Sequence, residues 1–150
     1  MFRKLFVIML GIALLGGFTV AEASHVVLKL RVDTNGFATF DSGPAGPGGG
    51  FPFYVSGDIC KEKTLGGPCT PIGVFHCWGW TTAAGPAVVS QEFDLWGKGK
   101  IQVQGVEDEG HRAITGGTRK FKKVRGEATA FDFSVADEFI VKFNLINVIE

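Results

Sequence analysis

The sequence predicts an all-β protein, and three features of its 150 residues carry that prediction. Apolar and polar side chains alternate along about eight short segments, which is the period of half-buried β-strands. The chain contains 22 glycines and 14 phenylalanines, a composition typical of short strands joined by tight turns. After the first residues, no segment has the apolar spacing of a long helix.

The first half of the chain contains three predicted strands. Residues 26–33 alternate strictly, and the DTNG that follows them is typical of a turn. Residues 37–41 are then expected to form a short strand, and residues 51–59 a longer one. Between them, SGPAGPGGG at 42–50 is a loop by composition, which we interpret as a surface loop or lid.

The second half supplies the other predicted strands. These lie at residues 74–81, 88–95, 101–105, 111–114, 127–134 and 139–147. A meander of short strands must hide its edges, and closure into an antiparallel barrel of eight strands hides them completely. A sandwich of two sheets is the competing architecture, and strand spacing does not exclude it.

The first 23 residues have the pattern of a secretory signal peptide. Arg3 and Lys4 precede an apolar run at 5–17, and Ala21-Glu22-Ala23 follows as an A-x-A cleavage site. The run is short for a bilayer span of roughly 20 residues, which disfavours the alternative of a retained anchor. We therefore expect cleavage after Ala23, a secreted or periplasmic protein without a stable membrane anchor, and a single domain over 24–150.

Charge and cysteine content narrow the expected partners. The chain is neutral overall, so it has no global field for collecting nucleic acid, and no nucleic-acid partner is expected. An exported protein can form disulfides. Cys60 and Cys69 flank a polar stretch with glycine and proline and are the favoured pair, which leaves Cys77 as a free, buried thiol. The spacing of Cys and His matches no standard zinc finger.

One segment carries a family resemblance. Residues 113–127 read AITGGTRKFKKVRGE, which resembles the AITGGTG-x-F-x-x-x-x-G signature of allene oxide cyclases and the GGTG-x-F-x-x-A-x-G signature of dirigent proteins. The likeness extends over roughly residues 53–145 as a pattern of strands and glycines. The sequence departs from both signatures at Arg119, which stands where GGTG has its last glycine. If that position has positive φ, arginine is strained there.

The resemblance implies an antiparallel barrel of eight strands around an apolar cavity, often assembled as a trimer, with no metal and no organic cofactor. Allene oxide cyclases isomerise a fatty-acid epoxide, and dirigent proteins hold reactive intermediates so that coupling or cyclisation is stereoselective. Both act mainly by restricting a reactive apolar guest. The acidic and amide residues of the plant cyclase's first strand have no match in residues 26–33, so its catalytic residues are not carried over.

The most informative group of side chains is His76, Trp78 and Trp80, which share one face of a predicted strand. If that face lines the barrel, the two indole rings form the walls of a ligand-binding cavity and His76 can transfer a proton near neutral pH. The alternative is a core strand in which His76 is simply a buried, hydrogen-bonded residue.

Three further residues are candidates for the polar part of the site. Tyr54 and Asp58 share a strand face, and Glu92 follows on a later strand. We assign Tyr54 to ligand binding with Trp78 and Trp80, because a phenol can contact an aromatic guest. Inside a cavity, Asp58 or Glu92 could join His76 as a catalytic acid or base. The alternative is plain exposure of a polar strand face.

The segment 112–125 invites two other interpretations. Gly116, Gly117 and Thr118 lack the spacing of a phosphate-binding loop and are expected to form a structural turn. The cations around them suggest an anion site, but a solvated rim is favoured, since Phe121 is the only interleaved stacking residue. This basic cluster comprises Arg112, Arg119, Lys120, Lys122, Lys123 and Arg125.

These observations predict a secreted barrel that binds a small apolar or aromatic molecule and guides its cyclisation or isomerisation without cofactor or metal. One alternative is a carrier of the same fold without turnover. Another is a structural or surface-interaction protein whose barrel supports loops such as 42–50. An enclosed cavity separates the first two classes from the third.

Overall fold

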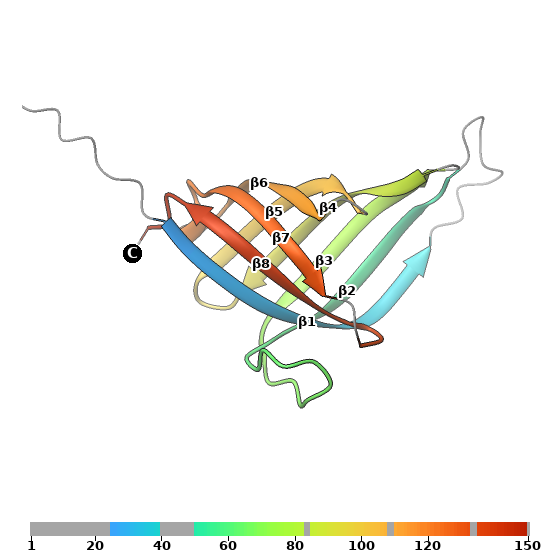
Figure 1. The fold of residues 1–150 in the computed structure, drawn as a ribbon, viewed down its shortest axis with the longest axis horizontal. Helices are drawn as coiled ribbons and strands as arrows, with labels where there is room; N and C mark the ends of the chain where they lie inside the picture. Colours follow the sequence, from blue (N-terminus) through green and yellow to red (C-terminus); the bar gives the residue numbers. More distant parts are fainter. Residues whose placement is uncertain (1–24, 40–49, 83–84, 108–109, 133–134, 150) are drawn as a thin grey trace, which may run out of the picture.

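Eight antiparallel strands close into a barrel in the computed structural model, which describes residues 25–39, 50–82, 85–107, 110–132 and 135–149 (Figure 1). The strands follow one another around the barrel in chain order, and the last strand pairs with the first, so no edge is left open. This confirms the predicted barrel and excludes the sandwich. The elements are β1 (His25–Thr39), β2 (Pro52–Cys60), β3 (Pro71–Thr82), β4 (Gly85–Leu95), β5 (Gly99–Val106), β6 (His111–Gly117), the 3₁₀ turn η1 (Arg119–Phe121), β7 (Arg125–Asp132) and β8 (Glu138–Ile146).

The first strand differs from its prediction. β1 is continuous across the DTNG segment, where a turn was expected, and a register shift lies between Thr34 and Gly36. Its first part pairs with β8, and its second part pairs with β2 alone. Gly36 lies against Ser56, whose Oγ would be 2.8 Å from an added Cβ. A β-bulge bends the strand here, so turn-forming residues are accommodated without ending it.

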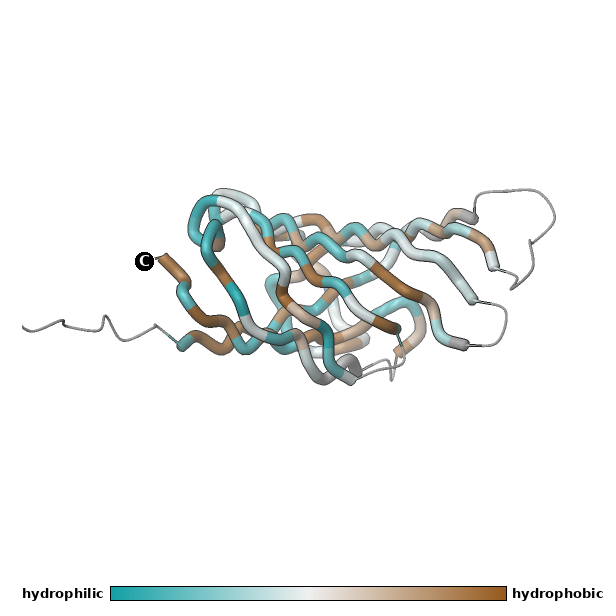
Figure 2. The backbone as a smooth tube through the Cα atoms, turned by 90° about the horizontal axis from the view of Figure 1, so that it is seen from above, coloured by the Kyte–Doolittle hydropathy of each residue, from teal (hydrophilic) through white to brown (hydrophobic). Residues whose placement is uncertain are grey.

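Apolar side chains from alternate positions of the strands form most of the barrel interior. In Figure 2 apolar and polar residues alternate along the tube, as expected for strands with one buried face. Four phenylalanine rings form the centre, with Phe75 5.0 Å from Phe93 and 5.1 Å from Phe139, and Phe93 4.9 Å from Phe143 between centroids. These tilted and edge-on contacts are the favoured geometry for aromatic pairs.

A disulfide closes the long loop between β2 and β3. Cys60 and Cys69 are bonded, which is the pairing that the sequence favoured, and Cys77 is a free, buried thiol. Glu62 ties the loop ends together by accepting hydrogen bonds from the Thr70 amide at 2.7 Å and the Thr70 hydroxyl at 2.8 Å. These bonds lower the pKa of the Glu62 carboxyl.

Arg31 fixes this loop, residues 61–70, to the outside of the barrel. Its side chain is fully buried although it leaves β1 on the outer side. Its Nη1 donates to the carbonyl of Thr64 at 2.8 Å, and its Nη2 donates to the carbonyl of Gly67 at 2.7 Å and to Glu138 Oε1 at 3.0 Å. The other oxygen of Glu138 accepts from the Gly66 amide at 2.8 Å. The guanidinium therefore joins the loop to the start of β8.

The glycine-rich signature forms a turn, as expected. β6 ends at Gly117, where an added Cβ would meet the Lys100 carbonyl oxygen and lie 2.7 Å from Phe121 Cβ. The Thr118 amide donates to the Lys100 carbonyl at 3.0 Å, and the Lys100 amide donates to the Thr118 hydroxyl at 3.0 Å. Arg119 has φ of 51°, so the departure from glycine places an arginine in the left-handed region.

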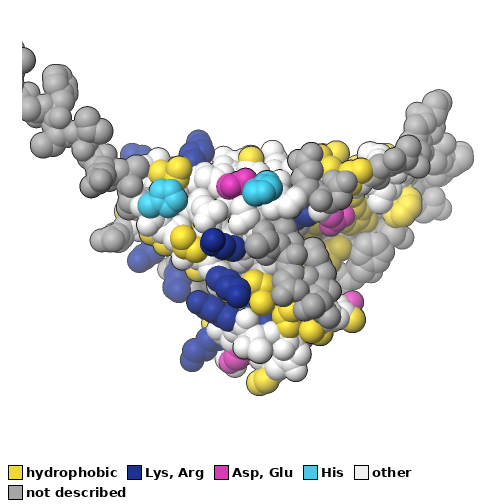
Figure 3. Space-filling view, in the orientation of Figure 1, with side chains coloured by type: hydrophobic (Ala, Val, Ile, Leu, Met, Phe, Trp, Pro, Cys, Tyr) yellow, Lys and Arg dark blue, Asp and Glu magenta, His cyan; other side chains and the backbone are white. Residues whose placement is uncertain are grey.

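Charge is sorted along the barrel although the whole chain is neutral. Where β4 turns into β5 and β6 turns into β7, six exposed cations form what we call the basic end: Lys98, Arg119, Lys120, Lys122, Lys123 and Arg125. At the opposite ends of the same strands lie the acidic residues Glu107, Asp137 and Glu138. In Figure 3 the Lys and Arg side chains gather toward the left, where β1 begins and β8 ends in Figure 1.

Two earlier expectations concern parts of the chain that this structure does not cover. The proposed signal peptide at 1–23 and most of the loop at 42–50 lie outside the described residues. Within the described ranges, no helix has the length and hydropathy needed to cross a bilayer.

Candidate ligand-binding cavity

The predicted aromatic site lies on the outer surface of the barrel. Along β3 the inward positions are held by Phe75 and Cys77, each 2 % exposed, whereas Trp78 is 45 % and Trp80 50 % exposed. The prediction that Trp78 and Trp80 form the walls of the interior is therefore wrong. Both faces of this strand are apolar. The period of two therefore showed which side chains share a face, but it did not show which face points into the barrel.

The other predicted site residues accompany the tryptophans on this outer surface. Tyr54 Oη is 2.5 Å from His76 Nδ1, and the two rings are stacked with centroids 5.9 Å apart. Glu92 faces His76 across the β3–β4 pair and is held by Lys100, whose Nζ lies 2.6 Å from Glu92 Oε1. This contact raises the pKa of Lys100.

Asp58 stands apart from these residues, at the far end of β2. Its carboxylate accepts a long hydrogen bond of 3.5 Å from Asn35 Nδ2. The structure thus brings together Tyr54, His76 and Glu92 but leaves Asp58 separate, and it places all four outside the barrel. Their predicted catalytic and binding roles would have to be exercised on an open surface.

Next to Trp78 and Trp80, the outer surface carries a shallow groove of about 560 Å³. Val88, 54 % exposed, borders it opposite Trp80, and Ser90 and Gln104 supply its polar atoms. The groove has no charged lining residue among those described. It is open to solvent and does not enclose a guest as the predicted site would.

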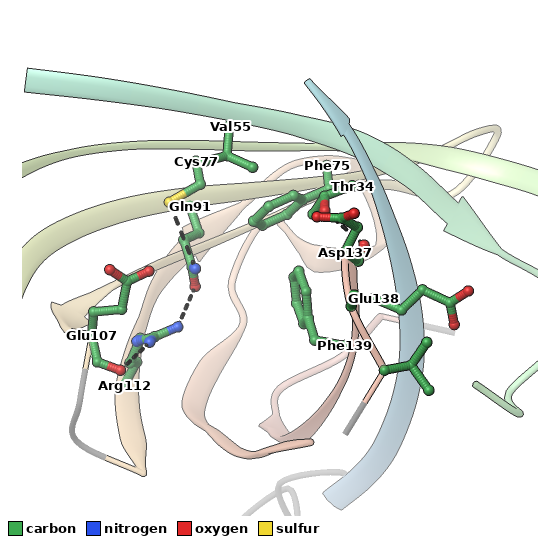
Figure 4. Close-up of a pocket in the computed structure, with 12 residues that line it drawn as sticks. Thr34, Val55, Phe75, Cys77, Gln91, Glu107, Arg112, Asp137, Glu138 and Phe139 are labelled. Carbon is green, nitrogen blue, oxygen red and sulfur yellow. Dashed lines mark hydrogen bonds between the residues drawn. The ribbon is translucent and has the colours of Figure 1, made fainter. Parts of the chain in front are cut away.

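A cavity of about 250 Å³ opens inside the barrel, at the end away from the basic end (Figure 4). Its walls come from β1, β2, β3, β4, β6 and β8, from Glu107 directly after β5 and from the turn before β8. Twelve residues line it: Thr34, Val55, Phe75, Cys77, Gln91, Glu107, Arg112, Val135, Ala136, Asp137, Glu138 and Phe139.

One side of the cavity is apolar and aromatic. The rings of Phe75 and Phe139 meet edge to face at an interplanar angle of 75°, and Val55 and Cys77 continue the wall. Such a surface suits a flat apolar or aromatic guest, which gains contact area and ring–ring packing. Of these four residues, sequence reasoning singled out Cys77 alone, as a free, buried thiol.

The opposite side is polar because Gln91 and Arg112 point inward from β4 and β6 (Figure 4). Arg112 Nη1 donates to Gln91 Oε1 at 3.0 Å, and Arg112 Nη2 donates to the carbonyl of Glu107 at 2.7 Å. Gln91 Nε2 lies 3.8 Å from Cys77 Sγ. Gly105 makes room for this arrangement, since a Cβ there would be 3.0 Å from Arg112 Cγ.

Burial changes the proton affinities of two of these groups. It raises the pKa of the Cys77 thiol to about 11, so this residue is a neutral thiol near neutral pH and a poor nucleophile. Burial lowers the pKa of Arg112, which the Glu107 carboxylate partly opposes. An arginine stays charged even so, and the cavity therefore contains a fixed positive charge beside an amide.

The sequence contained a signal for both polar residues. Gln91 interrupts an otherwise apolar strand face with Val89, Phe93 and Leu95, and it is 4 % exposed. Arg112 alternates with Ile114, and it is 2 % exposed. Its assignment to the surface basic cluster was wrong, because β6 turns this position inward. A polar residue on an apolar strand face was the pattern to follow.

The mouth of the cavity is held by backbone contacts of the turn before β8. The amide and the hydroxyl of Thr34 both donate to the carbonyl of Asp137 at 2.6 Å, and Asp137 has φ of 62°. The next residue, Glu138, is fixed by Arg31. The loop closed by the disulfide thus contacts the residue that borders the mouth.

The described residues bring three potential metal ligands together at one place, formed by Asp33, Cys60 and Cys69. Because both sulfurs are used in the disulfide, they are not thiolates and cannot ligate zinc in the usual way. This cluster does not fit a metal site.

Comparison with known proteins rests on structure alone, since no family model and no curated protein sequence matches the chain. A solved structure of a pyocyanin demethylase superposes with a TM-score of 0.60 at 21 % identity, covering 80 % of this chain and 99 % of that one. A pterocarpan synthase dirigent protein superposes with a TM-score of 0.58 at 17 % identity, covering 86 % and 91 %.

These similarities show the fold. The chain has a closed antiparallel barrel of eight strands, as the resemblance at 113–127 implied, and this fold is similar to that of the two solved structures. At such low identity, neither neighbour's substrate nor its reaction transfers to this chain.

Proposed function

We propose that this protein binds a small apolar or aromatic molecule inside the barrel and guides its cyclisation or isomerisation without a cofactor. The observation that carries this proposal is the cavity of about 250 Å³ with aromatic walls and a polar side. Its size is near the lower end of ligand pockets, which favours a compact guest. Both structural neighbours have names that refer to small-molecule chemistry, which supports the same class of ligand.

The residues of the cavity suggest how a reaction would be guided. Phe75 and Phe139 would hold the guest in one orientation, which lowers the entropic part of the barrier. Arg112 carries positive charge at the polar side and would stabilise negative charge that develops on an oxygen of the guest. Glu107 and Asp137 border the mouth and are the carboxylates placed to exchange a proton.

We also propose that the protein works outside the cytoplasm after cleavage behind Ala23. The support is the charged, apolar and A-x-A order of residues 1–23. The bond between Cys60 and Cys69 supports an oxidising compartment as well. Sequencing the N-terminus of the protein recovered from the periplasm or medium of an expressing bacterium tests this, and a start at Met1 would contradict it.

Binding in the cavity is tested with a dye that becomes fluorescent in apolar surroundings, anilinonaphthalene sulfonate, and with competing phenolic and polycyclic ligands. The described tryptophans are all exposed on the outside, so their own emission would report the outer groove instead. We expect saturable dye binding that Val55→Phe weakens at least about tenfold, because the added ring occupies the cavity.

The matched control is Trp80→Ala, which changes the outer groove and leaves the cavity intact. We expect it to bind the dye as the unmodified protein does. If Val55→Phe retains full binding, or if Trp80→Ala removes it, the ligand site is on the outside and the proposed cavity site is wrong. Circular dichroism of each variant shows whether the barrel is retained.

Turnover separates an enzyme from a carrier of the same fold. Isomerisation or cyclisation of this kind conserves the mass of the guest, so the product is a new chromatographic peak of unchanged mass. A ligand that binds and is recovered unchanged would identify a carrier. The Arg112→Gln variant then reports whether the charge contributes to rate, to binding or to both.

We further propose that copies of the chain associate as the resemblance suggests, through the exposed apolar side chains of the outer face. Phe51, Trp78, Trp80 and Val88 are between 45 % and 54 % exposed, and exposed apolar clusters of this kind commonly mark interfaces. Light scattering during size exclusion should give the mass of a trimer, and Trp80→Ser should shift it toward a monomer. A monomeric unmodified protein would contradict the proposal.

A further inference from the structure

The basic end is built so that its cations must face solvent. In the turn from β6 to β7, Phe121 is 5 % and Val124 0 % exposed, and the amide of Val124 donates to the carbonyl of Phe121 at 3.0 Å. These two side chains anchor the turn in the barrel. The cations on either side of Phe121 and Val124 are consequently directed outward, as their exposure shows.

Two other segments join this turn into one surface. The amide of Lys120 donates to the carbonyl of Lys98 at 3.2 Å, and the amide of Ile149 donates to the carbonyl of Lys120 at 3.0 Å. The turn from β4 to β5, with Lys98, therefore lies against the turn from β6 to β7. The two turns are thus joined into one face at this end of the barrel.

The acidic residues nearest to this face in the described part of the chain, Glu92 and Asp94 on β4, pair with Lys100 and with none of the six cations. No acidic residue occurs between Trp96 and Val106, or between His111 and Gly126. The ion pairs found among the described residues involve none of the six cations of the basic end. Lys100, which does have acidic partners, lies outside the basic end as defined. Such a concentration of like charge in a neutral chain fits an anionic partner.

Apolar groups at the same end identify the kind of partner. Trp96 is 56 % exposed in the turn beside Lys98, and Ile149 is 38 % exposed beside Lys120. Exposed Trp next to Lys and Arg is typical of surfaces that rest on a bilayer, where the indole enters the headgroup region and the cations meet anionic lipid. Surfaces for single-stranded nucleic acid usually have several stacking rings among the cations, whereas Trp96 is the one exposed ring among the described residues of this end and Phe121 is buried.

The start of β1 lies at the basic end, which also fits a lipid partner. β1 begins at His25, which pairs with Ile146, and Ile146 also pairs with Arg125 of the basic end. The apolar run at 5–17 precedes β1 in the sequence. While the leader is bound at the membrane, the start of β1 would be held near the bilayer. The basic end would consequently be the part of the barrel nearest to the lipid.

We propose that the basic end docks reversibly on anionic phospholipid, with Trp96 in the headgroup region. The cavity mouth lies at the opposite ends of the same strands, so it would face the solvent while the protein is docked. This is a peripheral contact, in agreement with the expectation that no stable anchor remains after cleavage. It does not depend on what the cavity binds.

The test uses the chain that starts at Ser24, because every strand and the whole described core lie within residues 25–149. Its partition onto vesicles of phosphatidylcholine is compared with that onto vesicles of equal parts phosphatidylcholine and phosphatidylglycerol. We expect binding to the anionic vesicles only, lost as salt is raised past about 0.1 M, where the Debye length is about 10 Å.

Charge-reversal variants locate the contact. Each cation near an anionic surface strengthens binding about fivefold, so the double variant Lys122→Glu with Lys123→Glu should lose at least about 25-fold. The matched control is Lys61→Glu with Lys63→Glu, the same change of charge on the exposed loop 61–70. We expect this control to bind within about threefold of the unmodified chain, and Trp96→Ala to bind several-fold more weakly than Trp80→Ala.

Three outcomes would overturn the proposal. The first is no binding to anionic vesicles at low salt, and the second is an equal loss for both double variants. The third is a soluble polyanion such as heparin binding the basic end while vesicles do not, which would make the partner a polymer. Circular dichroism confirms that the variants are folded, and dye binding in the cavity should be unchanged in all of them.

Discussion

The two faces of β3 differ in almost everything except hydropathy. Phe75 and Cys77 point inward and are almost completely buried, while Trp78 and Trp80 point outward and are about half exposed. Both pairs are apolar and alternate with the same period. The hydropathy of a single strand therefore does not show which of its faces lines the barrel. The orientation of the strand within the closed sheet decides which side chains point inward.

The largest expected effect separates the two faces directly. Phe75→Ala removes a ring packed against Phe93 and Phe139 and should lower the free energy of unfolding by about 4 kcal/mol. In the monomer, Trp80→Ala removes a larger side chain from the outside and should cost about 1 kcal/mol or less. Urea unfolding followed by circular dichroism measures both. Equal losses would mean that the two faces are not inside and outside.

Arg31 sharpens the comparison because it points outward and is nevertheless buried. Arg31→Met leaves Glu138 and the carbonyls of the loop without their donor, so we expect a loss of about 3 kcal/mol. Lys29→Met, on the same side of β1 but exposed, should change stability by about 0.5 kcal/mol or less. A small effect at Arg31 would show that the loop does not cover it in solution.

The disulfide is the next effect in size. Replacing Cys60 and Cys69 by serine removes a short covalent loop, which corresponds to about 2–3 kcal/mol of unfolding free energy. The reduced unmodified protein should unfold at the same urea concentration as the double variant. An unfolding midpoint that does not change when reductant is added would show that the disulfide is not formed. Cys77→Ser leaves the bond intact and serves as the control for loss of a thiol.

The smallest effect concerns the backbone rather than a face. Arg119 has φ of 51°, so Arg119→Gly should stabilise the barrel by about 1 kcal/mol by relieving left-handed strain. Lys120→Gly, one residue later in the 3₁₀ turn, should not stabilise, because glycine there only adds freedom to the unfolded chain. Thermal unfolding of the two variants decides the sign.

Much of the fold could be predicted from the sequence, and the predictions that were wrong failed for physical reasons. Strand alternation, the signature at 113–127 and the favoured pairing of Cys60 with Cys69 led to the right barrel and disulfide. The DTNG segment was taken for a turn, because a β-bulge and a turn use similar residues. The strand assignment could not show that a loop would cover Arg31, because this contact joins segments that lie far apart in the sequence.

The candidate site was harder to predict than the fold. His76, Trp78 and Trp80 attracted attention because they are chemically versatile, yet they lie outside. Much of the cavity is lined by residues such as Phe75 and Val55, which resemble ordinary core positions in a sequence. A polar residue on an apolar strand face, as at Gln91, indicates an interior site better than a cluster of aromatic residues does, since burying an amide without a partner is costly.

The pairing of β1 with β8 has a consequence for the order of folding. The start of β1, residues 25–30, finds its strand partner only in β8, so the barrel cannot close until nearly the whole chain is available. Contacts this distant along the chain carry a large loop-closure cost and form slowly. A chain that leaves a translocation pore with its N-terminus first would keep the start of β1 unpaired until β8 emerges, although the end of β1 can already pair with β2. The same pairing that leaves the finished barrel without an edge thus delays its completion.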